Sequence, residues 1–64
     1  MERGQRLYLD GRYGEAGAAF EAAFAAQPFA AFLYNAGVSY ENAANLSRAI
    51  EFFRRYLDDN HQVA

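Results

Sequence analysis

The side chains of this sequence that could bind a metal ion lie close together in one short segment. Asp58, Asp59, Asn60 and His61 are all residue types that coordinate metals. A protein metal site takes three or four ligands in a fixed geometry, and no second cluster of such residues exists elsewhere in the sequence. A polar segment of this kind is expected to fray from the end of a helix. We therefore expect a solvated tail and no metal site.

Residues for nucleophilic or acid–base catalysis are also present, but they lack partners. Ser39 and Ser47 have no base within helical reach, because the sole histidine is distant in the sequence. Glu41 and Glu51 are expected on different helices, with no neighbour that would tune either carboxylate. The glycines do not form a phosphate-binding loop. The sequence therefore predicts a non-catalytic protein without a cofactor.

The pair Arg54-Arg55 could hold an anion. Acidic residues flank it, with Glu51 on one side and Asp58 on the other. Glu51 precedes Arg55 by four residues, which is the favourable order for an ion pair on a helix surface. We expect a charged helix surface at this position.

Composition limits the classes of protein that remain. The chain has 64 residues, of which 53% are hydrophobic, so it is too apolar for intrinsic disorder and forms one small domain over residues 1–64. Its six basic residues are all Arg and are outnumbered by eight acidic ones, which makes it a poor nucleic-acid binder. No apolar run is long enough for membrane insertion, and the charged N-terminal segment lacks a signal-peptide core. The cytoplasm is therefore the default location.

A chain this short often needs a further source of stability. Below roughly 70–80 residues, disulfides, metals or association commonly supply it. The sequence has no cysteine and one histidine. Association with another chain is the remaining candidate.

The apolar spacing predicts four helices joined by short turns. Asp10-Gly11 and the segment around Asn45 are typical of turns, and Asn45 can also cap the helix that follows. Pro28 separates the two middle helices. No segment alternates with a period of two residues. The expected fold is all-α, with two antiparallel helix pairs. The helices are expected at about 2–10, 13–26, 29–42 and from 46 onward.

Two of these helices carry clear apolar faces. The face of the third helix is expected to comprise Phe29, Leu33, Ala36, Gly37 and Tyr40. The fourth helix is expected to bury Leu46, Ala49, Ile50, Phe53, Tyr56 and Leu57.

An internal repeat relates the two helix pairs. Gly4 recurs as Gly37, Ala16 as Ala49 and Phe20 as Phe53, always at the same distance along the sequence. Leu7 and Tyr13 recur as Tyr40 and Leu46 at that distance, with the aliphatic and aromatic types exchanged. Small and aromatic residues that recur at such a period are typical of helical repeats, in which each helix pair buries its apolar face on its neighbour.

These residues resemble the tetratricopeptide repeat, a helix–turn–helix unit of about 34 residues. The second unit, 29–62, carries the fuller match in Leu33-Tyr34-Asn35-Ala36-Gly37 and Ala49-Ile50-Glu51-Phe52-Phe53. The first unit, 1–28, matches through Gly4, Leu7, Gly11, Tyr13, Ala16, Phe20, Ala23 and Pro28. The resemblance implies a fragment of a right-handed solenoid that binds proteins. The segment 52–57 is also similar to repeats attached to bacterial envelope and secretion proteins.

The chain departs from the family pattern at several positions. The first unit lacks the opening residues of its first helix. In the second unit Ala44 replaces the turn glycine, Tyr56 replaces a small residue, and His61 stands where a proline is expected. Tyr56 is therefore expected to face an open edge of the stack.

The resemblance also implies a binding groove lined by the first helix of each unit. A mixed strip of Tyr, Asn, Gln and Glu suits an extended peptide or a partner's helix. Alternatively, Tyr8 and Tyr34 simply cover the first layer of the core. Some members of this family clamp a C-terminal carboxylate with Lys and Asn side chains. In this chain Met1 and Gln5 occupy two of those positions, so no clamp is expected. The implied groove residues are Met1, Gln5, Tyr8, Leu9, Tyr34, Asn35, Val38, Glu41 and Asn42.

Self-association is the second hypothesis. Two units are fewer than the three or more that usually form a stable stack. The last helix is expected to expose an edge through which a homo-oligomer could form. The residues expected at this edge are Phe52, Tyr56 and Val63.

Overall fold

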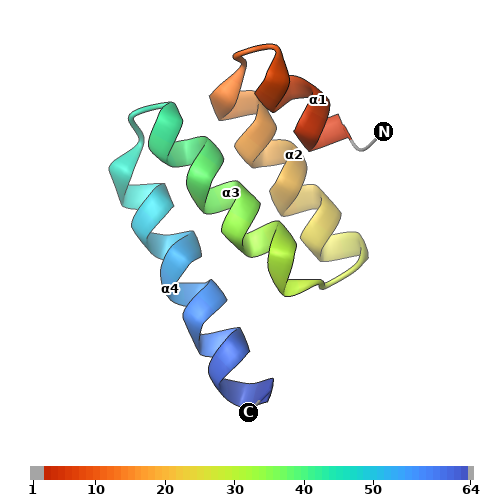
Figure 1. Cartoon of the computed structure of the whole chain (residues 1–64), viewed down its shortest axis with the longest axis vertical. Coiled ribbons are helices and arrows are strands. Elements are labelled where there is room, and N and C mark those ends of the chain that lie inside the picture. The colour runs from red at the N-terminus through yellow and green to blue at the C-terminus, as the bar shows by residue number, and fades with distance from the viewer. Residues whose placement is uncertain (1–2, 64) are drawn as a thin grey trace.

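The fold is entirely helical over the residues that the structure describes. The computed structural model covers the backbone of residues 3–63 and the side chains of residues 3–59. Neighbouring helices in the sequence pack against each other, and α2, α3 and α4 alternate in direction (Figure 1). The expected all-α fold with two helix pairs is confirmed. The helices are α1 (Arg3–Leu9), α2 (Tyr13–Ala26), α3 (Ala30–Asn42) and α4 (Leu46–Val63).

The turns inside the two helix pairs have the same backbone structure. Gly11 has φ of 80°, and Ala44, at the equivalent position of the second unit, has φ of 62°. The N–H of Arg12 donates to the carbonyl of Leu7 at 2.9 Å, and the N–H of Asn45 donates to that of Tyr40 at the same distance. Ala44 therefore takes the left-handed conformation that glycine adopts without steric cost.

Three glycines let adjacent helices approach closely. A β-carbon added at Gly4 would lie 2.8 Å from the Phe20 ring, and one at Gly37 would lie 2.7 Å from the Phe53 ring. These two contacts are equivalent, since both the glycine and the ring recur in the sequence repeat. A β-carbon at Gly17 would lie 2.7 Å from Tyr40, which connects the first helix pair to the second.

Tyr40 is the central residue of this connection. It is 6% exposed, its ring stacks on Phe52 with centroids 5.8 Å apart, and the Arg48 guanidinium lies 5.5 Å from its ring centroid. Its hydroxyl donates to the Glu21 carboxylate, which also pairs with Arg48 at 3.1 Å. Burial, together with the nearby Glu21 carboxylate, raises the pKa of Tyr40 to about 12.

The expected apolar face of the fourth helix is wrong in part. Leu46, Ile50 and Leu57 are 61%, 56% and 64% exposed, whereas Phe52 is 1% exposed. α4 packs on α3 through a neighbouring stripe that includes Ala49, Phe52 and Tyr56.

The expected oligomer edge is corrected by the same packing. Phe52 is buried and therefore cannot belong to an exposed edge, contrary to the sequence-based expectation. Tyr56 is only half-buried. The side chain of Val63 lies outside the described residues.

Two further expectations about α4 are corrected. The helix continues through the polar segment 58–61 to Val63 and does not end before it. Arg55 lies over the rings of Phe24 and Phe52, at 5.6 and 4.9 Å from their centroids. Within the described residues no ion pair joins it to Glu51. At an exposed site a cation–π contact contributes about 0.5–1 kcal/mol, no less than an exposed ion pair, so the two rings compete effectively with Glu51 for the guanidinium.

Adding one methyl group at Gly17 should destabilise the protein. Tyr40 cannot move away from a new β-carbon, because Phe52, Glu21 and Arg48 hold it. We expect Gly17→Ala to lower the free energy of unfolding by about 1–3 kcal/mol in urea denaturation. Gly14→Ala, in the same helix with nothing within 4 Å of its β-carbon, is the matched control. It should raise stability by about 0.4–1 kcal/mol; equal effects of the two substitutions would contradict the close packing.

Stability should fall at high pH because of Tyr40. Its folded pKa lies above the usual value of 10, so the neutral hydroxyl is the form that folding favours. The contribution is fully present below pH 10 and is lost as the pH rises through about 12, with a slope of at most about 1.4 kcal/mol per pH unit between these values. Urea denaturation of wild type and Tyr40→Phe from pH 8 to 12 measures this loss. The variant should show a shallower decline, and parallel curves would contradict the assignment.

Candidate functional site

A cleft of about 300 Å³ lies between α1 and α3. Two groups of polar and apolar side chains face each other across it, one from each helix. The base is Phe20, which comes from α2. The lining residues are Gln5, Tyr8, Phe20, Tyr34, Asn35 and Val38.

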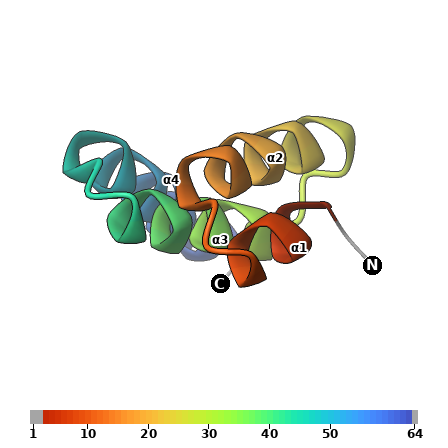
Figure 2. The same ribbon diagram turned by 90° about the horizontal axis from the view of Figure 1, so that it is seen from above.

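The helices bring the lining residues together through their spacing. Gln5 and Tyr8 lie three residues apart on α1, and Tyr34 and Val38 lie four apart on α3, so each pair shares a helix face. The Phe20 ring occupies the space above Gly4, which has no side chain to exclude it. α1 and α3 lie on the same side of α2 (Figure 2). The close contact of Gly4 with Phe20 therefore holds a lining residue of the cleft in place.

Tyr8 is held on both sides. Its ring meets Tyr13 edge-on with centroids 5.1 Å apart. Its hydroxyl accepts a hydrogen bond from Nδ2 of Asn42 at 3.1 Å, and the same amide donates to the carbonyl of Val38 at 2.9 Å. Asn42 therefore links α3 to α1 beside the cleft.

Tyr34 takes part in both the cleft and the packing of α4. Its ring centroid lies 5.7 Å from that of Phe53 and 5.3 Å from that of Tyr56. It is nevertheless 48% exposed and lines the cleft. The sequence left two alternatives for Tyr34, a residue of the groove or a cover for the core. In the structure it is both.

The structure does not bring every expected groove residue to the cleft. Glu41 is exposed and does not line it. Leu9 is 67% exposed and also lies outside it. Met1 falls outside the described residues.

Phe20 is the lining residue that the sequence interpretation missed. It is 4% exposed and was matched only to the packing pattern of the repeat. Its repeat relationship to Phe53 and the paired glycines Gly4 and Gly37 could have indicated an aromatic ring passing between helices.

The chemistry of the cleft is neutral. None of its six lining residues is charged. Phe20 and Val38 offer apolar surface, Gln5 and Asn35 offer amides that donate and accept, and the tyrosines offer flat rings. The volume is at the lower end of the range for small-molecule sites, so it suits one large side chain better than a whole cofactor. This arrangement can hold a neutral side chain and hydrogen-bond the backbone on either side of it.

The other candidates for chemistry find structural roles or no partners. Ser39 is fully buried, and its hydroxyl donates to the carbonyl of Asn35 at 2.8 Å. No three His, Cys, Asp or Glu side chains gather into a possible metal site among the described residues, and the His61 side chain lies outside them. Asn45 accepts a hydrogen bond from the N–H of Arg48 at 3.3 Å, as expected of a helix cap.

Comparison with protein-family models, curated proteins and solved structures finds no match to this chain. None of the helices over residues 3–63 is long and apolar enough to cross a membrane.

Truncating Tyr34 should lower stability as well as alter the cleft. Tyr34→Ala removes ring contacts with Phe53 and Tyr56, for which we expect a loss of about 1–3 kcal/mol in urea denaturation. Asn35→Ala, its neighbour in the cleft, should stay within about 0.5 kcal/mol of wild type. If the two variants are equally stable, the contacts of Tyr34 with α4 contribute nothing.

Proposed function

We propose that this chain is a non-catalytic protein-interaction module that binds a peptide or helix of a partner protein in the cleft between α1 and α3. The observation that carries the proposal is the convergence of Gln5, Tyr8, Tyr34, Asn35 and Val38 on one cleft. Those residues come from different helix pairs, so the cleft exists only when the units are stacked.

A single anchor side chain accounts for the size and chemistry of the cleft. A large apolar or aromatic residue of the partner would pack on Phe20 and Val38. Gln5 and Asn35, at the sides, would hydrogen-bond the partner's backbone. Because Tyr8 and Tyr34 are already held by neighbouring rings, they lose little conformational freedom on binding. Anchors of this kind supply most of the binding free energy of many interfaces.

We further propose that the chain consists of two units of the tetratricopeptide type. The turns at Gly11 and Ala44 and the contacts of Gly4 with Phe20 and of Gly37 with Phe53 support this assignment. Both pairs of features recur at the same spacing as the sequence repeat. In such a stack the first helices of consecutive units share one face, which is where the cleft lies.

Selection from a library of short random peptides tests the binding function. Peptides selected on the immobilised wild-type domain should share a large apolar residue. Gln5→Ala should weaken their binding roughly fivefold to tenfold, since it removes about one hydrogen bond. Val38→Glu should abolish it, because a carboxylate would be buried beneath the anchor.

Gln27→Ala is the matched control for Gln5→Ala. Gln27 is exposed in the connection between α2 and α3 and does not line the cleft. Its replacement should leave peptide affinity unchanged. NMR chemical-shift changes should centre on residues 5–8 and 34–38. Selected peptides that bind all three variants like wild type would refute the proposed site.

A further inference from the structure

An apolar stripe on α4 is largely exposed to solvent. Leu46, Ile50 and Leu57 are each more than half exposed and lie on one side of the helix, at the spacing of a helical face. Phe53, half-buried, lies among them. This stripe is the outer edge of the second helix pair.

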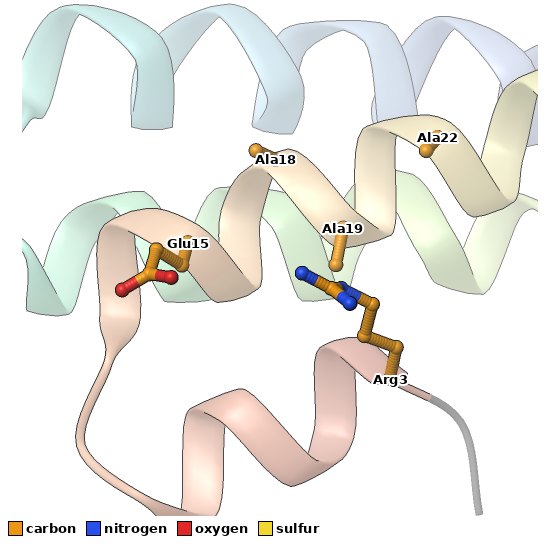
Figure 3. A pocket seen from close by; sticks show the side chains of 5 residues that line it. All are labelled: Arg3, Glu15, Ala18, Ala19 and Ala22. Atoms are coloured by element: carbon orange, nitrogen blue, oxygen red, sulfur yellow. The ribbon is translucent and has the colours of Figure 1, made fainter.

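A shallow cavity of about 320 Å³ lies at the opposite edge of the protein, between α1 and α2 (Figure 3). Three small residues, Ala18, Ala19 and Ala22, form its α2 wall. Two charged residues complete the lining: Arg3 from α1 and Glu15 from the start of α2. The first helix pair thus presents a hollow where the second presents a ridge.

The contact between the two helix pairs shows how such edges fit together. Glu21 of α2 pairs with Arg48 of α4 at 3.1 Å. Phe24 of α2 lies beneath the Arg55 guanidinium, 5.6 Å from ring centroid to Cζ. Gly17 of α2 receives the Tyr40 ring. The α2 face that carries these three residues is therefore seated against the second unit.

Each of these α2 residues has an equivalent on α4, at the same distance along the sequence that separates Gly4 from Gly37. The three equivalents lie on the exposed face of α4. Gly17 corresponds to Ile50, Glu21 to Arg54 and Phe24 to Leu57.

The residues of the second unit that contact α2 likewise have equivalents in the first unit, on α1 and α2 at the opposite edge of the protein. Tyr40 corresponds to Leu7, Arg48 to Glu15 and Arg55 to Ala22. Glu15 and Ala22 both line the shallow cavity.

The charged pair remains complementary after this shift because both signs reverse. Glu21 with Arg48 becomes Arg54 with Glu15. The contact of Phe24 with Arg55 also has a complementary counterpart after the shift, because a large side chain again meets a position with room for it. The large Leu57 meets the small Ala22, whereas Leu7, the counterpart of Tyr40, is buried within its own chain and takes no part in the match.

We propose that copies of this chain associate head to tail, with the Leu46–Ile50–Leu57 stripe of one copy docked on the alanine-lined cavity of the next. The contact repeats the internal interface of the two helix pairs. Arg54 of one copy pairs with Glu15 of the second copy at its rim. Among the described residues of one chain Glu15 pairs with Arg12, at 2.8 Å with both side chains more than half exposed, and a carboxylate can accept from both arginines.

This contact uses different surfaces on the two copies. Each associated pair still has one free cavity and one free stripe, so assembly is open-ended and depends on concentration. A symmetric pair of α4 helices would instead use the stripe twice and stop at a dimer. The two arrangements therefore predict different behaviour when one edge is blocked.

Sedimentation velocity of two edge variants tests the proposal. Ala22→Glu blocks the cavity and Leu57→Glu blocks the stripe, and both positions are exposed, so each variant should keep wild-type circular dichroism. Wild type should associate as its concentration rises from micromolar to roughly millimolar. Each variant alone should stay monomeric. An equimolar mixture should form heterodimers and nothing larger, because only one intact interface remains.

Three results would overturn the proposal: wild type that is monomeric throughout, a mixture that does not associate, or Ala22→Glu that associates like wild type. The last would indicate the symmetric α4 pair. Charge reversal provides a second test. Arg54→Glu and Glu15→Arg should each weaken association by roughly threefold or more, and the double variant should restore it. Failure of the double variant to recover would refute the ion pair.

Discussion

Close contact between a glycine and an aromatic ring is the constraint on which this fold depends. Within the described chain it occurs three times, between α1 and α2 at Gly4, between α2 and α3 at Gly17, and between α3 and α4 at Gly37. In each case the ring occupies the space of the missing side chain, so the helices cannot slide without a clash. A small domain without disulfides thereby fixes the register of four helices.

The same constraint joins the fold to the candidate site. The Phe20 ring that fills the space above Gly4 is also the base of the cleft. Tyr34 lines the cleft while it packs on Phe53, the ring that fills the space at Gly37. Residues of the cleft are therefore held by the core. Such a surface is rigid before a partner arrives, which lowers the entropic cost of binding.

The sequence predicted the helices well because local signals mark their ends. Pro28, the Asp-Gly turn and the cap at Asn45 each act within a few residues. It did not predict which side of α4 is buried. Two overlapping stripes of apolar residues, one through Ile50 and one through Phe52, both have helical spacing. The choice between them depends on how α4 packs on α3, which the spacing within α4 does not reveal. Phe20 was not predicted to line the cleft, because its position there depends on a contact with Gly4, which lies on another helix.

Positions that break the repeat are as informative as those that keep it. If Glu15 were an arginine like its equivalent Arg48, a stacked copy would place it against Arg54, and like charges would oppose the contact. If Ala22 were an arginine like its equivalent Arg55, its side chain would fill the hollow that Leu57 of a stacked copy enters. These departures compensate each other in two pairs, Arg54 with Glu15 and Leu57 with Ala22, so the outer edges of the two helix pairs stay complementary. Edges that faced only solvent would have no physical need for this compensation.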